Sequence, residues 1–175
     1  LMGPCLGGQA YHPIMQDFVF QNRDTGFLGI AGPAFVKAQL GEEIDLRTLS
    51  GVEAHTVKSG QTHLVTENDK DALDKAKELL AFLPQNNKED PPRIEGKDDP
   101  ERTSPSLLDI VPDAANVAFD MKRVIKEIVD DGHFFELHKD HARCMIIGFG
   151  RFGGRTAGIV ANQPAYGAGA ITCDA

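Results

Sequence analysis

The chain lacks tryptophan altogether and contains only two tyrosines and three cysteines among its 175 residues. The cysteines, Cys5, Cys144 and Cys173, form neither a CxxC pair nor an even disulfide framework, which favours a reducing, intracellular compartment. A net charge of −8 argues against a nucleic-acid partner held by phosphate neutralisation, while a small anionic ligand needs only a few local donors. The sequence has no apolar run of membrane-spanning length and no signal-peptide pattern, so no membrane association is expected.

The composition that remains is typical of a globular chain. Hydrophobic residues make up 41% of it and charged residues 25%, enough for one domain or one and a half. Residue 1 is leucine, and the chain opens at once in a glycine-rich turn, Gly3–Gly8. It closes soon after a predicted hairpin. We therefore expect a piece of a longer protein, with exposed apolar surface where partial domains leave their cores uncovered.

Short elements are predicted before residue 66. Apolar periodicity and turn residues indicate a helix over residues 9–18, strands over 18–20 and 27–31, and a helix over 34–40 between Pro33 and Gly41. Residues 42–65 are polar and are predicted to form a loop with short helical pieces. The clearest helix spans residues 66–83, with Thr66 as its N-cap and Pro84 after its end. Its apolar positions recur at spacings of three and four: Ala72, Leu73, Ala76, Leu79, Leu80 and Leu83.

A polar stretch separates this part from a second, β-rich part. Residues 85–105 contain hardly any apolar side chain and are predicted to form an exposed linker. Residues 121–129 are predicted to be helical, and residues 134–137 to form a short strand. The β-rich segments 144–149 and 156–161 flank a glycine-rich hairpin signal. The predicted class is therefore mixed α/β.

Only weak signals for chemistry stand out from the residues themselves. Gly7-Gly8 precedes a predicted helix, where backbone N–H groups can form an oxyanion hole or simply make a turn. His138 and His141 have metal-ligand spacing but no third ligand, so no metal is predicted. Ser59, bracketed by His55 and His63, lacks the GxSxG context of a hydrolase. Two further candidates fall short: Cys5 has no evident base, and residues 148–154 lack the Lys-Ser/Thr of a phosphate loop.

The opening segment GPCLGGQAYHP resembles the pattern GPCAGGAxYSPA, with Gln9 in place of its alanine. This pattern is found in the carboxyltransferase (β) subunits of biotin-dependent acyl-CoA carboxylases, of the propionyl-CoA carboxylase type, and the sequence resembles that family. Further matching segments follow in the same order: Phe27–Pro33 with Val36-Lys37, Gly41–Glu43, Leu49–His55, Ser59-Gly60 with His63, Phe82–Pro84, Asp109–Pro112 and Gly154–Pro164. No single motif is decisive, but their collinear order is specific and covers nearly the whole chain.

The resemblance implies a fold and a domain plan. It implies a crotonase-like (ClpP/crotonase) α/β fold built from repeated ββα units, with parts of two homologous domains. Residues 1–84 then correspond to the later part of an N-domain that binds acyl-CoA, and residues 85–105 to the linker. Residues 106–175 correspond to the start of a C-domain that binds carboxybiotin. The active site is expected between the N-domain of one subunit and the C-domain of another.

The resemblance also implies roles for individual residues. Gly7 and Gly8 are expected to be catalytic, as N–H donors to the thioester oxygen of an enolate. Other residues are expected to bind the acyl-CoA substrate: Gly3, Pro4, Cys5, Tyr11, Ser59 and Gly60. Asn162 and Gln163 are expected on the carboxybiotin side. The glycine motif for the biotin carbonyl is expected beyond residue 175, so the chain is expected to be inactive alone.

The implied reaction is carboxyl transfer from carboxybiotin to the α-carbon of a short acyl-CoA such as propionyl-CoA. The implied partners are a biotin carboxyl carrier protein, which carries the biotin cofactor, a biotin carboxylase, and further copies of the chain. The implied location is the cytoplasm, or the mitochondrial matrix in a eukaryote. Two alternatives stay open: the carboxyltransferase subunit of a sodium-pumping, biotin-dependent acyl-CoA decarboxylase, and a non-catalytic acyl-CoA-binding or assembly piece. The residues do not settle which acyl-CoA is used or the oligomeric state.

Overall fold

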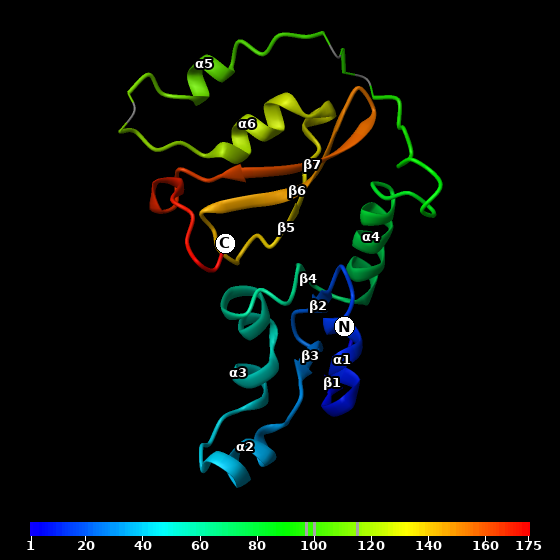
Figure 1. Ribbon diagram of the computed structural model, residues 1–175, viewed down its shortest axis with the longest axis vertical. Coiled ribbons are helices and arrows are strands. Elements are labelled where there is room, and N and C mark those ends of the chain that lie inside the picture. Colours follow the sequence, from blue (N-terminus) through cyan, green and yellow to red (C-terminus); the bar gives the residue numbers. More distant parts are fainter. Residues whose placement is uncertain (97, 100, 115) are drawn as a thin grey trace. The chain divides into compact units, whose positions relative to one another are not determined.

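The chain forms two compact units in a computed structural model that describes residues 1–96, 98–99, 101–114 and 116–175 (Figure 1). The first unit comprises residues 1–76 with His138–His141, and the second comprises residues 77–137 with 142–175. Each unit combines short strands with helices, which confirms the predicted α/β class. The division into two homologous domains joined by a linker stays a prediction.

The first unit contains two pairs of parallel strands. β1 (Pro4–Leu6) pairs with β3 (Phe27–Gly29), and β2 (Phe20–Asn22) pairs with β4 (Leu64–Thr66). The two strands predicted here were placed correctly to within about two residues. They do not pair with each other, because each finds its partner far away in the sequence, as parallel strands require.

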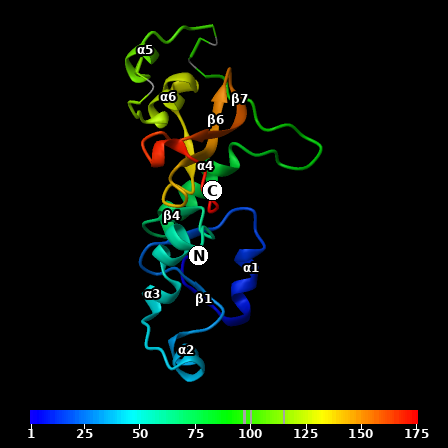
Figure 2. The same cartoon turned by 60° about the vertical axis from the view of Figure 1, so that its left-hand side comes forward.

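The helix predicted over residues 9–18 is much shorter in the structure. A 3₁₀ turn, Gly7–Ala10, leads into the single turn of α1 (Tyr11–Ile14). Met15, just after α1, is 81% exposed, so it gains no packing that would extend the helix. The prediction for α2 (Pro33–Leu40) is confirmed: proline starts it, and Gly41 ends it in the left-handed region at φ 72°. α2 lies at the end of the first unit away from β4 (Figures 1 and 2).

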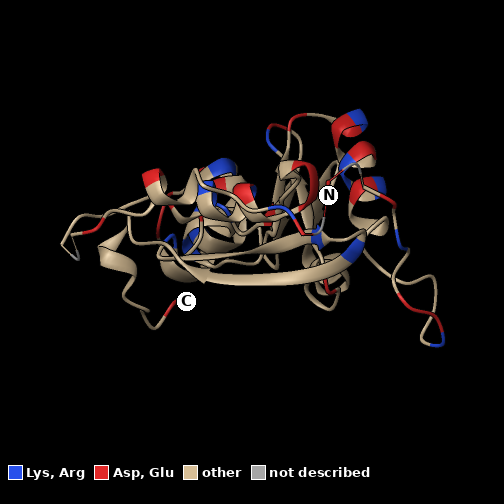
Figure 3. Cartoon of the chain, turned by 90° about the horizontal axis from the view of Figure 1, so that it is seen from above, with Lys and Arg blue, Asp and Glu red and all other residues tan. Residues whose placement is uncertain are grey.

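The clearest predicted helix exists as α4 (Asp69–Leu80), and both acidic and basic residues occur along it (Figure 3). It starts three residues later than expected. Thr66 is not its N-cap, because Thr66 ends β4, is fully buried, and donates its hydroxyl to Asn22 Oδ1 at 2.5 Å. The side chain of Asn68 takes the capping role instead, since its Oδ1 accepts a hydrogen bond from the Asp71 N–H at 3.0 Å. Between α2 and β4 lie two further helical segments, α3 (Leu46–Ser50) and a π-helical turn, Ala54–Lys58.

An antiparallel sheet with a covering helix forms the second unit. The sheet order is β5 (Phe135–Leu137), β6 (Met145–Phe152) and β7 (Arg155–Asn162), which confirms the predicted hairpin. Two helices precede the sheet, α5 (Leu107–Ile110) and α6 (Met121–Ile128). The core lies between α6 and the sheet, where one buried cluster consists of Ile125, Val129 and Ile146.

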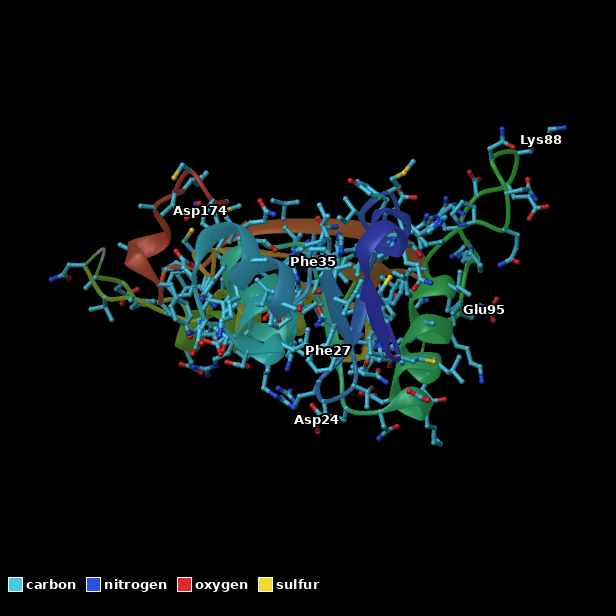
Figure 4. The ribbon with its side chains drawn as sticks, turned by 90° about the horizontal axis from the view of Figure 1, so that it is seen from below. Asp24, Phe27, Phe35, Lys88, Glu95 and Asp174 are labelled. Carbon is cyan, nitrogen blue, oxygen red and sulfur yellow. The ribbon has the colours of Figure 1, made fainter. Side chains whose placement is uncertain are left out.

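The described residues between α4 and α5 form no helix or strand, and most are exposed, as predicted for the segment 85–105. Figure 4 labels Lys88 and Glu95 in this stretch. The segment still contacts the sheet of its own unit, because the Ile94 N–H donates to the Gly154 carbonyl at 3.0 Å. Arg102 also donates to the Val129 carbonyl, at 3.3 Å. The polar sequence therefore lies partly along the β6–β7 hairpin.

The carboxylate of Asp130 caps the turn between β6 and β7. It accepts the N–H groups of Gly153 at 3.0 Å and Gly154 at 2.7 Å, both of which have positive φ. We expect Asp130→Ala to lower the free energy of unfolding by about 2 kcal/mol, because two N–H groups lose a charged acceptor. Denaturant titration measures this loss. The matched variant Asp109→Ala, at an exposed position of α5, should change it by less than about 0.5 kcal/mol, and equal losses would contradict the role of Asp130.

Candidate functional site

The glycine pair of the opening segment follows directly after β1. Leu6 pairs with Gly29 at the ends of β1 and β3, so the turn starts where this strand pair ends. Gly7 has φ 68°, a conformation that side-chain-bearing residues rarely adopt. At Gly8 the backbone sets no such demand, and a Cβ there would meet no atom within 4 Å. The fold therefore explains glycine at position 7 and leaves it unexplained at position 8.

The other residues predicted in this segment lie around the same turn. Gly3 precedes β1, and Pro4 begins this strand opposite Phe27 of β3. The thiol of Cys5 donates to the Gln9 carbonyl at 3.2 Å. Tyr11 begins α1 and is 55% exposed. The structure thus places the predicted residues of the opening segment around one exposed turn of the first unit.

A hydrogen-bonded pair lies on the π-helical turn. His55 Nδ1 is 3.2 Å from Ser59 Oγ, and His55 Nε2 is 2.6 Å from the Leu28 carbonyl of β3. Sequence reasoning selected Ser59 as a candidate substrate-binding residue but gave His55 no role. The spacing of four residues between them is the only local signal of this pair, and the contact with β3 is long-range.

Gly60 completes this turn and requires glycine for two reasons. Its φ is 66°, and an added Cβ would lie 2.6 Å from Cδ2 and Nε2 of His141. His141 is fixed in turn, because its Nδ1 lies 3.1 Å from the Val57 carbonyl. The predicted residues Ser59 and Gly60 thus occupy a turn held against β3 on one side and against His141 on the other.

Three histidine rings lie together next to this turn. The ring centroids of His63 and His138 are 4.3 Å apart, and those of His138 and His141 are 6.1 Å apart. Burial, followed by the proximity of the other two rings, lowers the pKa of His138 to about 4, and burial also lowers the pKa of His63. His138 Nδ1 is buried without a hydrogen-bond partner. The surroundings of His63 and His138 therefore favour the neutral form of these two rings.

This cluster makes the stability of the fold sensitive to acid. Well above pH 6.5, His138 is neutral both folded and unfolded, so its titration does not change the free energy of unfolding. As pH falls from 6.5 towards 4, His138 becomes protonated in the unfolded chain but stays neutral in the folded one, so the free energy of unfolding decreases. We expect His138→Asn, which tolerates the φ of 52° found here, to flatten the decline of Tm between pH 7 and pH 5. Thermal melts across this range test it, with exposed His12→Asn as the control; equal slopes in all three proteins would exclude the role of His138.

The two residues predicted on the carboxybiotin side belong to the second unit. Gln163 is 2% exposed; its Oε1 accepts the Met121 N–H at 3.0 Å, and its Nε2 donates to Asp120 at 2.6 Å. Asn162 donates its amide to the Gly169 carbonyl at 2.6 Å. Both side-chain amides are therefore engaged in holding the start of α6 and the segment after β7.

A hollow of about 510 Å³ lies on the first unit, beside the π-helical turn. Its charged lining consists of three basic and two acidic side chains: Arg23, Arg47, Lys58, Glu53 and Asp140. Two of the bases are already paired, Arg23 with Glu67 at 2.7 Å and Arg47 with Asp24 at 3.3 Å. Across the residues that the structure describes, no group of three or more His, Cys, Asp or Glu side chains is arranged to hold a metal ion. Among the same residues, no helix has the length and apolar character needed to cross a membrane.

The fold is the crotonase-like α/β fold of solved carboxyltransferases. The carboxyl transferase domain model matches residues 1–175, and the chain belongs to this family. A crystal structure of transcarboxylase 12S with methylmalonyl-CoA and methylmalonic acid bound superposes with a TM-score of 0.93 at 38% identity, over 98% of this chain and 33% of that one.

Curated relatives match over the whole chain. The propionyl-CoA carboxylase carboxyltransferase subunit of Haloferax mediterranei is 45% identical over 100% of this chain and 34% of its own length. The methylmalonyl-CoA decarboxylase subunit alpha of Veillonella parvula is 41% identical over the same shares. The mitochondrial propionyl-CoA carboxylase beta chain of Rattus norvegicus is 41% identical over 98% of this chain and 32% of its length. The chain thus spans about one third of the length of these relatives.

Proposed function

We propose that this chain contributes the acyl-CoA side, and part of the carboxybiotin side, of a biotin-dependent carboxyltransferase. The reaction is transfer of a carboxyl group from carboxybiotin to the α-carbon of a short acyl-CoA such as propionyl-CoA. The observation that carries this proposal is the 45% identity to a propionyl-CoA carboxylase subunit along the entire chain. The exposed Gly7-Gly8 turn supports it, since acyl-CoA chemistry at the α-carbon needs donors for a developing enolate oxygen.

The chain's own contribution is electrostatic. The N–H groups of the Gly7-Gly8 turn would donate to the thioester oxygen, which gains negative charge as the α-carbon loses its proton. Gly3, Pro4, Cys5 and Tyr11 would line the approach of the acyl-CoA, together with Ser59 and Gly60 from the second turn. Carboxybiotin supplies the carboxyl group when bound. Gln163 is buried with its amide held inside the protein, so of these two side chains only the exposed Asn162 would have an N–H left for a biotin carbonyl.

A transfer assay tests this function. The natural polypeptide that contains these residues is mixed with propionyl-CoA and a biotin carrier protein carboxylated with labelled bicarbonate. The expected result is label in an acid-stable dicarboxylic acyl-CoA. Absence of transfer to any short acyl-CoA, with a carrier that donates to a known carboxyltransferase, would rule the proposal out.

A second function is favoured by the identity of 41% to a methylmalonyl-CoA decarboxylase subunit. The same turns would then serve transfer in the opposite direction, from methylmalonyl-CoA to biotin. The direction is tested by copurification, since a decarboxylase would bring a membrane-embedded partner and a carboxylase a biotin carboxylase. Acyl-CoA binding in calorimetry without transfer in either direction would instead favour a non-catalytic binding piece.

The assembly follows from the same proposal. We expect a biotin carboxyl carrier protein and a biotin carboxylase as partners, and several copies of the chain in one complex. A cytoplasmic location, or the mitochondrial matrix in a eukaryote, fits the relatives, one of which is mitochondrial.

A further inference from the structure

We infer that His55 is a positioning residue that turns Ser59 Oγ into a hydrogen-bond acceptor for an amide N–H of acyl-CoA. The inference rests on the proposed function and deepens it, because it assigns the polarity of one substrate contact. It follows from the two hydrogen bonds of the His55 ring and from the place of Ser59 beside the β1–β3 pair.

The first step is the tautomer of His55. A backbone carbonyl only accepts hydrogen bonds, so the 2.6 Å contact between His55 Nε2 and the Leu28 carbonyl requires hydrogen on Nε2. In the neutral ring, Nδ1 is then bare and only accepts. The hydrogen bond to β3 thus determines which ring nitrogen of His55 is the acceptor.

The second step is the direction of the Ser59 hydroxyl. With Nδ1 bare, the 3.2 Å contact requires Ser59 to donate its only hydrogen to His55. Ser59 Oγ also accepts the Gln61 N–H at 3.3 Å, which leaves one lone pair on an exposed side chain. That lone pair binds a donor and repels another acceptor. The thioester oxygen is only an acceptor, whereas the two amides of the pantetheine arm of CoA each offer an N–H.

The third step is position. Leu28, which holds His55, pairs with Cys5 of β1, and the next pair is Leu6 with Gly29. Gly7 follows Leu6 directly, and a Cβ on it would lie 4.0 Å from the Ile30 carbonyl. Ser59 is therefore tied, through one ring and one carbonyl, to the strand pair that delivers the Gly7-Gly8 turn. We expect an acyl-CoA whose thioester lies at that turn to reach Ser59 with one of its pantetheine amides.

The test is calorimetric binding of propionyl-CoA to the natural polypeptide, read as Kd. Ser59→Ala and His55→Ala should each weaken binding about tenfold, as expected for one lost hydrogen bond. The double variant should be no weaker than either single one, because both changes remove the same contact. His55→Gln should bind nearly as wild type, since its amide can donate to Leu28 and accept from Ser59. His12→Ala, at an exposed position, is the matched control.

A substrate analogue separates positioning from mere support of the fold. Analogues of propionyl-CoA with one pantetheine amide N–H replaced by an ester oxygen should bind wild type about tenfold more weakly at one of the two amides. The His55→Ala variant should no longer distinguish that analogue from propionyl-CoA. Equal affinity of wild type for all analogues, with carboxyl transfer intact, overturns this inference alone. Failure of wild type to bind propionyl-CoA at all overturns the proposed function with it.

Discussion

Gly8→Ala is expected to leave the fold intact and to slow carboxyl transfer to acyl-CoA about 100-fold, the loss typical of one oxyanion-hole donor. The reason lies in the contrast between the two glycines. Gly7 has φ 68° and is required by the backbone, whereas an added Cβ at Gly8 meets no protein atom within 4 Å. A methyl group at position 8 therefore occupies space that no protein atom fills. We expect it to hold the thioester oxygen away from the N–H groups of the turn.

Two measurements are needed for this prediction. Thermal melting should show Gly8→Ala within a few degrees of wild type, and the transfer assay should show the loss in rate. Gly158→Ala is the matched control, since a Cβ at that exposed position of β7 also meets no atom within 4 Å. Full activity in Gly8→Ala would show that no substrate approaches this backbone, and the Gly7-Gly8 turn would then be structural.

Gly148→Ala is expected to have the largest effect on stability and to lower the free energy of unfolding by about 3 kcal/mol or more. If the wild-type protein is less stable than this, the variant should not be expressed in soluble form. Gly148 lies in the middle of β6, opposite Glu136 of β5. An added Cβ would lie 2.2 Å from the Phe135 carbonyl oxygen and 2.8 Å from ring carbons of Phe134. A backbone oxygen cannot rotate away as a side chain can, so the pairing of β5 with β6 has to open.

Denaturant titration of the purified variant, or its yield in the soluble fraction, measures this effect. The control comes from the neighbouring strand. Gly158 in β7 pairs with Phe149, one residue after Gly148, and has open space around it. Gly158→Ala should match or slightly exceed wild type, because alanine loses less conformational entropy in a strand. Equal stability of Gly148→Ala and wild type would mean that β5 does not pack against β6 as described.

The sequence predicted the elements that local patterns encode. The β6–β7 hairpin was foreseen from its glycines, and α2 from Pro33 and Gly41, because turns and caps depend on a few adjacent residues. The pairing of β1 with β3 and of β2 with β4 was not foreseen. Strands of three residues have too little pattern to reveal a partner, and a parallel partner is far away in sequence. Thr66 was misassigned for a related reason, since its partner Asn22 lies 44 residues away.

The candidate site divides in the same way. The Gly7-Gly8 turn was apparent from adjacent residues, and the family resemblance pointed to Ser59. His55 was missed, because its meaning depends on the Leu28 carbonyl of a distant strand. The histidine cluster was noticed as a spacing, but the ring contacts that lower the pKa of His138 appear only once residues 63 and 138 are brought together.

Residues His138–His141 have a consequence for how the protein is made. They belong to the first unit, although more than sixty residues of the second unit separate them from Ala76. A ribosome releases the chain from its N-terminus, and the leading segment usually folds first. Here the turn of Ser59 and Gly60 cannot make its contact with His141 until that residue, much later in the sequence, has been synthesised. We therefore expect the first unit to remain protease-sensitive on nascent chains until residue 141 has left the exit tunnel, so that the turn of Ser59 and Gly60 matures late.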